Sequence, residues 1–293
     1  MSTNAISSRA MLASINISVW EARKQDKALT HEINAAHNAA DDAARVHKSL
    51  IARKAFADID AVAREARRMH YARTLPWADS GTRLLSNEGF DAWSERVKDL
   101  SARFDAAADA FDAAYPALYA QARIDLNGMF KEADYPNPRD IRRRFSFARK
   151  IWAMPTASDF RIDLANGESD RVRAEIQAEI DATMTAANRD IAERVESVVS
   201  AMVDKLGAYK PAAKKGEKSE GIFRDSLVEN VRDLAALLPS LNVTGNAKLA
   251  DIGARLAALG AADAAQLRDS DNIRTSTAAA AAAILSDVAE FFA

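Results

Sequence analysis

Residues 170–206 carry apolar side chains at helical spacing along their whole length, and this pattern constrains the fold more than any other feature of the chain. From Ile180 to Met202 the steps are four, three, four, four, three and four residues. Such an eleven-residue repeat favours a straight or slightly right-handed pairing with another helix. At about 1.5 Å per residue the helix would be roughly 50 Å long. The stripe consists of Val172, Ile176, Ile180, Met184, Ala187, Ile191, Val195, Val198, Met202 and Leu206.

A second apolar stripe has a different period. It repeats every seven residues, through Val97, Leu100, Phe104, Ala107, Phe111, Ala114 and Leu118. A strict heptad predicts left-handed supercoiling against a partner helix. Asp105, Asp109 and Asp112 fall on the outer side, and Pro116 is expected to kink or end this helix. Two long helices of this kind predict an antiparallel hairpin or an interface between copies of the chain.

The remaining helices follow from periodicity and from few breakers, since only 10 Gly and 7 Pro occur in 293 residues. We expect helices over residues 21–73, interrupted near 49–54, and over 222–238, 247–259 and 272–292. Residues 208–221 are rich in lysine, proline and glycine, which is typical of a flexible linker. The predicted organisation is a long-helix domain over 1–207, the linker 208–221, and a C-terminal helical segment 222–293 that packs on the first domain.

A small β element interrupts this helical pattern. Residues 14–20 alternate polar and apolar side chains, which predicts a strand. Residues 144–164 have strand-like composition on both sides of Pro155, which predicts a hairpin. The predicted fold class is therefore mainly α, with long antiparallel helices in a helical hairpin or coiled-coil-like bundle and a small β-hairpin or three-stranded β element.

Composition and motif searches exclude several classes of function. The chain has no cysteine, so it holds no disulfide, thiol nucleophile or Cys-ligated metal. His31 and His37 are six residues apart, which places them on opposite faces of a helix; His37 and Asp41 could share a metal, but a site needs more ligands. No phosphate-binding loop or nucleophile elbow occurs. We therefore predict no catalytic residue, no metal, no cofactor and no enzyme.

The chain also lacks membrane signals. No apolar run approaches the ~20 residues of a spanning helix, and the N-terminus does not resemble a signal peptide. We expect a cytoplasmic protein that contacts no membrane.

The most unusual segment chemically is residues 139–150, called here the basic segment. It has six basic residues and one acid, in a chain whose net charge is −2. Arginines neutralise phosphates and aromatic rings stack on single-stranded bases, so we expect a candidate nucleic-acid surface here. Alternatively, Phe145 and Phe147 share one face of a strand and point into the core, while the arginines pair with Asp105, Asp109 and Asp112. The candidate residues are Arg139, Arg142, Arg143, Arg144, Phe147, Arg149, Lys150 and Trp152.

Three short motifs occur in order with long helices between them: Thr74-Leu75-Pro76-Trp77 followed by Gly81-Thr82-Arg83-Leu84-Leu85, Tyr135-Pro136 through Phe147 with Asp159-Phe160-Arg161, and residues 223–230. In this arrangement the chain resembles a family of uncharacterised proteins from bacteriophages, prophages and integrative elements. Members of that family tend to be encoded near MoxR-type AAA+ ATPases and recombination genes. The resemblance implies a phage or mobile-element setting, in the host cytoplasm, and it implies no catalytic residues.

Three hypotheses follow. The first is a self-associating helical scaffold protein, because a monomer would struggle to cover two long apolar stripes. The second is a single-stranded DNA-binding accessory that uses the basic segment. The third, drawn from the resemblance alone, is an adaptor for an AAA+ ATPase.

Overall fold

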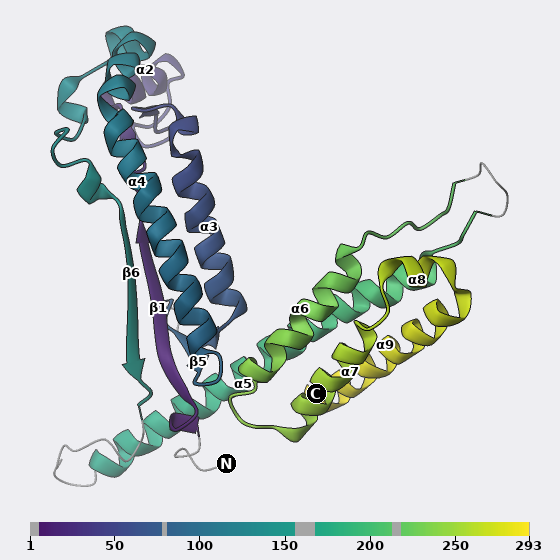
Figure 1. Ribbon diagram of the computed structural model, residues 1–293. Helices are drawn as coiled ribbons and strands as arrows, with labels where there is room; N and C mark the ends of the chain where they lie inside the picture. The colour runs from purple at the N-terminus through teal and green to yellow at the C-terminus, as the bar shows by residue number, and fades with distance from the viewer. Residues whose placement is uncertain (1–5, 78–80, 156–167, 213–217, 293) are drawn as a thin grey trace. The chain divides into compact units, whose positions relative to one another are not determined.

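The computed structural model describes residues 6–77, 81–155, 168–212 and 218–292. Helices make up 66% of the structure and the strands are few and antiparallel, so the predicted mainly α class is confirmed. The chain forms two compact units. Figure 1 shows the helices and strands, coloured by residue number. Unit 1 contains Met1–Ser14, Tyr71–Trp93 and Ile151–Ala293, and unit 2 contains Ile15–His70 and Ser94–Lys150.

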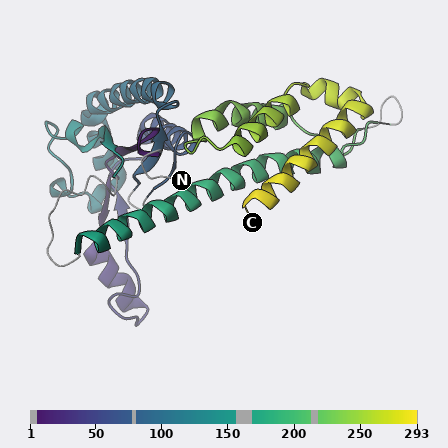
Figure 2. The same cartoon turned by 90° about the horizontal axis from the view of Figure 1, so that it is seen from below.

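Unit 1 is built along the predicted long helix. This helix, α5, runs from Glu168 to Ala208. It packs most extensively on α9 and also on α6, and Figures 1 and 2 both show α9 beside the C-terminal half of α5. The other helices of the unit are α6 (Ser226–Leu241), α7 (Ala247–Leu259), α8 (Ala264–Asp269) and α9 (Asp271–Phe292). Predicted and observed boundaries agree closely for α5, α7 and α9, where the apolar period is regular.

The apolar stripe of α5 is buried within unit 1. From Ile180 to Leu206 every predicted position is buried except Val198, which is only partly buried. Its neighbour Val199 is fully buried instead. Side chains of α6 and α9, including Leu238 and Ile284, belong to the same core cluster. The stripe is therefore covered without a second chain, which removes the reason to expect self-association from it. Whether the protein self-associates stays a prediction.

Unit 2 contains α2 (Lys27–Ala36) and most of α3 (Ala57–Ala72) and α4 (Phe90–Leu126). Buried side chains of α3 and α4 share one core cluster, for example Ile59 with Phe104. Across the same helix pair, Arg103 donates to Glu65 at 2.8 Å and Arg96 also pairs with Glu65. Hydrogen bonding from Arg103 is the main cause that lowers the pKa of Glu65.

The heptad predicted for α4 is only partly correct. Val97, Leu100, Phe104 and Phe111 are buried, but Ala114 is exposed, and Ala108 and Tyr115 take the core positions instead. The observed series advances eleven residues from Val97 to Ala108, which suits a straight helix better than a supercoiled one. α4 also continues through Pro116 to Leu126, so the helix does not end at the proline. Pro116 is exposed, where water can hydrogen-bond to the carbonyl that the proline leaves unpaired.

The helix predicted over residues 21–73 is wrong in its first half. Strand β2 (Arg23–Gln25) pairs antiparallel with β3 (His47–Ser49), and α2 lies between them. Asp26 begins α2 as an N-cap, because its side chain accepts a hydrogen bond from the Leu29 amide. The interruption predicted near 49–54 is confirmed, and it extends further back along the chain than expected.

Among the described residues, the main sheet has four strands in the order β4-β5-β1-β6. They are β1 (Ala10–Ser18), β4 (Leu75–Pro76), β5 (Arg83–Ser86) and β6 (Ser146–Ala153). The strand predicted at 14–20 thus begins four residues earlier, and β6 matches the first half of the predicted hairpin. The second half, residues 159–164, lies outside the described residues. β4 and β5 were not predicted, because two- and four-residue strands are too short to show a period.

Residues 208–221 connect two parts of unit 1. Lys210 and Glu220 form an antiparallel bridge, and their side chains form an ion pair at 3.2 Å. The helices on both sides of this connection, α5 and α6, pack on each other within the same unit.

Candidate functional site

Arg142 pairs with the acidic residues of α4, as the alternative interpretation of the basic segment predicted. Its Nε donates to Asp109 at 2.5 Å and its Nη2 donates to Asp105 at 2.9 Å. These bonds, the one to Asp109 first, raise the pKa of Arg142 above the usual arginine value. The predicted pairing with the acidic face of α4 is therefore confirmed for this arginine, which holds residues 142–145 against α4.

The two phenylalanines of the segment point into unit 2, also as the alternative expected. Phe145 is buried and its ring centroid lies 5.1 Å from that of Phe111. Phe147, on β6, is partly buried, with its ring centroid 5.8 Å from that of Phe104. Phe145 anchors the segment, while Phe147 keeps part of its surface accessible.

The other cations of the basic segment are exposed. Arg139, Arg144 and Lys150 form no ion pair with any residue that the structure describes. Among the described residues, Arg149 forms no ion pair, and it donates a hydrogen bond to the Ser94 hydroxyl at 2.8 Å. Arg143 faces the exposed carboxylate of Asp140 at 3.5 Å. Several cations of the basic segment are therefore left without an acidic partner among the described residues.

Trp152, the last of the predicted candidates, belongs to unit 1. Its side chain is 43% exposed and the neighbouring Ile151 is 40% exposed. Few large apolar side chains of the described residues are as exposed as these two.

A cleft lies in unit 2 between α4 and β6, called here the α4–β6 cleft. Its volume is about 420 Å³. It is lined by Ser94, Glu95, Val97, Lys98, Ser101, Ala102 and Asp105 of α4 and by Phe147 and Arg149 of β6. The structure thus places two of the predicted candidates in one concave site, next to α4 residues that the sequence did not single out.

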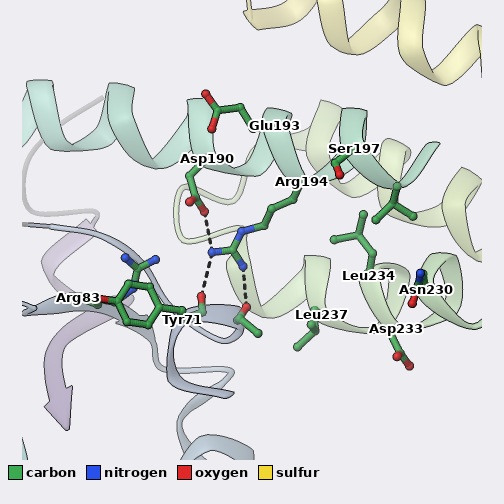
Figure 3. A pocket seen from close by; sticks show the side chains of 12 residues that line it. Tyr71, Arg83, Asp190, Glu193, Arg194, Ser197, Asn230, Asp233, Leu234 and Leu237 are labelled. Carbon is green, nitrogen blue, oxygen red and sulfur yellow. Dashed lines mark hydrogen bonds and ion pairs between the residues drawn. The ribbon is translucent and has the colours of Figure 1, made fainter. Parts of the chain in front are cut away.

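A second hollow, called here the α5 groove, lies in unit 1 and was not predicted. Its volume is about 750 Å³, and Figure 3 shows its lining from α5, α6 and the chain near Tyr71 and Arg83. At its centre Arg194 donates to the carbonyl oxygens of Ala72 at 2.6 Å, Tyr71 at 2.9 Å and Thr74 at 3.0 Å. Asp190 lies 2.7 Å from the same guanidinium.

Arg83 also forms hydrogen bonds in this groove. Its guanidinium donates to the Thr74 hydroxyl at 2.8 Å and carbonyl at 3.0 Å, and lies 4.4 Å from the centre of the Tyr71 ring. Burial is the main cause that lowers the pKa of Arg83, and the nearby Arg194 lowers it further. The two leucines that follow Arg83, Leu84 and Leu85, are the only local sequence signal that this arginine lies in a buried segment. Its neighbour Arg194 follows far along the chain, so no local pattern reveals the pair.

Neither hollow contains an arrangement typical of catalysis. Within the described parts of the chain, no group of three or more His, Cys, Asp or Glu side chains could hold a metal. His31 lies 3.7 Å from Asp41, but both side chains are largely exposed. Lys48 is the buried lysine of unit 2, and its Nζ lies 2.6 Å from Asp134 and 2.8 Å from the Met129 carbonyl oxygen. These contacts join β3 to the chain after α4, which is a structural role.

Comparison with known proteins adds no assignment. No protein-family model, no curated protein and no solved structure matches the chain. The resemblance to bacteriophage proteins therefore stays a prediction, as does an AAA+ ATPase partner. Among the described residues, no helix is both long and apolar enough to cross a membrane.

Proposed function

We propose that the protein is a non-enzymatic accessory protein that binds single-stranded nucleic acid through the basic segment. The observation that supports this most directly is the exposure of Arg139, Arg144, Arg149 and Lys150, none of which has a carboxylate partner among the described residues. Cations placed this way are available to phosphates, whereas paired cations are not. The phage setting of the predicted family would suit such a role and is part of the proposal.

The anchored backbone of the segment, in addition to its positive charge, supports nucleic-acid binding. Phe145 and Arg142 attach the turn to α4, so the exposed cations project from an anchored backbone. A fixed cluster loses less conformational entropy on binding than cations on a disordered tail. β6 continues directly from this turn with Arg149 and Lys150.

The test measures binding of labelled single-stranded oligonucleotides by fluorescence anisotropy over a range of salt concentrations. Four phosphate contacts predict a slope of about −2.8 in the logarithm of the binding constant against the logarithm of salt. Affinity should therefore fall about 50-fold between roughly 50 and 200 mM salt. Replacing Arg139, Arg144 and Lys150 together by Ala should reduce the slope to about −0.7 while helix content is unchanged.

A matched control removes the same charge elsewhere. Arg173, Arg189 and Lys205 are exposed on α5 in unit 1, and replacing these three by Ala should leave the slope at the wild-type value. If wild-type protein binds no oligonucleotide at low salt, the proposal is wrong. Equal losses in the two triple variants would also contradict it, because they would indicate a response to net charge alone.

A further inference from the structure

The α4–β6 cleft is lined by both apolar and polar side chains. Phe147 provides an aromatic ring, and Ala102 adds apolar surface from α4. Its volume of about 420 Å³ lies within the range of roughly 300–1,000 Å³ found for small-ligand pockets. The ring centroid of Phe147 lies 5.8 Å from that of Phe104, so Phe147 packs against the core of unit 2.

The polar groups of the cleft include both donors and acceptors. Arg149 and Lys98 are exposed cations, and the hydrogen bond from Arg149 to Ser94 holds the guanidinium at the cleft. Glu95 is an exposed carboxylate that forms no ion pair with another described residue. Asp105 accepts from Arg142 through one oxygen, so its hydrogen-bonding capacity is already partly used.

We infer that the cleft binds a single nucleobase of the strand that the basic segment holds. The inference rests on the proposed function and adds the site at which a base, rather than a phosphate, is recognised. The base lies against the Phe147 ring, and the adjoining phosphate lies at Arg149 and Lys98. Glu95 accepts a hydrogen bond from an exocyclic amino group of the base.

The carboxylate makes the site selective. Carboxylates accept hydrogen bonds from the amino group of cytosine, whereas thymine presents a carbonyl oxygen at the same position. Two oxygens that both carry negative charge repel each other, and neither can donate. The cleft therefore favours cytosine over thymine, two bases of the same ring size.

The experiment compares the full chain with oligonucleotides of equal length and charge that contain only dC, only dT, or abasic residues. We expect dC to bind about tenfold more tightly than dT, and abasic strands to bind more weakly than either. Glu95→Ala should reduce the dC-to-dT ratio to about one, because dC loses its hydrogen-bond acceptor while dT is relieved of repulsion by the carboxylate.

Phe147→Leu tests the stacking surface. Leucine keeps an apolar contact with Phe104 but has no ring, so the difference between dC and abasic strands should shrink. Because this residue is partly buried, thermal unfolding must first show that the variant is folded. Glu95 is exposed, so its variant tests the inference even if Phe147→Leu does not fold.

Equal binding of dC, dT and abasic strands, with steep salt dependence retained, would overturn the inference and leave the proposed function standing. A dC preference that persists unchanged in Glu95→Ala would overturn it as well. If no strand binds at low salt, the proposed function is wrong and the inference is wrong with it.

Discussion

The α5 groove and the basic segment are both rich in arginine, and they use it in opposite ways. In the groove, Arg83 and Arg194 are engaged by backbone oxygens, a hydroxyl and Asp190. In the basic segment only Arg142 is engaged to this degree, while Arg139 and Arg144 remain exposed without an ion pair among the described residues. An arginine that is already satisfied contributes to stability, and an unsatisfied one is available for a ligand.

The largest effect that we predict lies in the α5 groove. Arg194→Ala leaves the carbonyl oxygens of Tyr71, Ala72 and Thr74 without this donor and leaves Asp190 without its nearest cation. The free energy of unfolding should fall by about 3 kcal/mol, since hydrogen bonds to charged groups contribute roughly 1.5–3 kcal/mol. Denaturant unfolding followed by circular dichroism measures this.

Arg189→Ala is the matched control for this variant. Arg189 lies on the same helix and also pairs with an acid four residues away, Glu193 at 2.9 Å, but both side chains are largely exposed. Such a pair contributes roughly 0.5 kcal/mol or less. Similar losses in the two variants would show that Arg194 has no special role in the groove.

The next effect concerns two tyrosine hydroxyls of unit 2, which are uncharged at neutral pH. Burial raises the pKa of Tyr115 to about 12, and its hydroxyl donates to the Pro136 carbonyl oxygen at 3.2 Å. Burial likewise raises the pKa of Tyr135 to about 12. The unfolded chain ionises near pH 10 and the folded chain near pH 12, so the folded state binds more protons in between and stability falls as the pH rises through this window.

Tyr115 alone should account for a loss of roughly 2 kcal/mol between about pH 10 and 12. Denaturant unfolding at several pH values measures the dependence. Tyr115→Phe should be less steep over the same window, while lysine titration affects both proteins equally. An unchanged slope in the phenylalanine variant would mean that Tyr115 is not the group responsible.

The smallest effect separates the two kinds of arginine within the basic segment itself. Arg142→Ala should lower the free energy of unfolding by about 1 kcal/mol, because its pairs with Asp105 and Asp109 are partly solvent-exposed. Arg144→Ala should change it by less than about 0.5 kcal/mol, as expected for an exposed position.

Oligonucleotide binding should show the reverse order. Arg144→Ala should reduce the salt slope by about 0.7, and Arg142→Ala should change it little. If Arg142→Ala reduces binding more than Arg144→Ala does, without loss of structure, the distinction between engaged and available arginines fails for this segment.

Most of the helical architecture could be predicted because it depends on local periodicity. The stripe of α5 contains large apolar residues at nearly every step, so its length and buried face follow directly from the sequence. The stripe of α4 contains many alanines, and alanine at positions 107 and 108 fits either a heptad or an eleven-residue repeat. The position of Tyr115 in the core resolves that ambiguity only after packing is known.

The short strands and the arginine contacts depended on partners that lie far away in the sequence. β5 pairs with β1, with Leu84 opposite Leu12, and no pattern within either segment specifies that register. Arg194 likewise reaches the carbonyl oxygens at the C-terminal end of α3, and Arg142 reaches Asp109, only when the helices have packed.

The chain alone therefore specified long amphipathic helices and a surplus of cations at residues 139–150, since helix formation and charge are properties of consecutive residues. Packing decided which of those cations remain available. A guanidinium is neutralised by groups within a few ångströms, and residues from distant parts of the chain provide those groups.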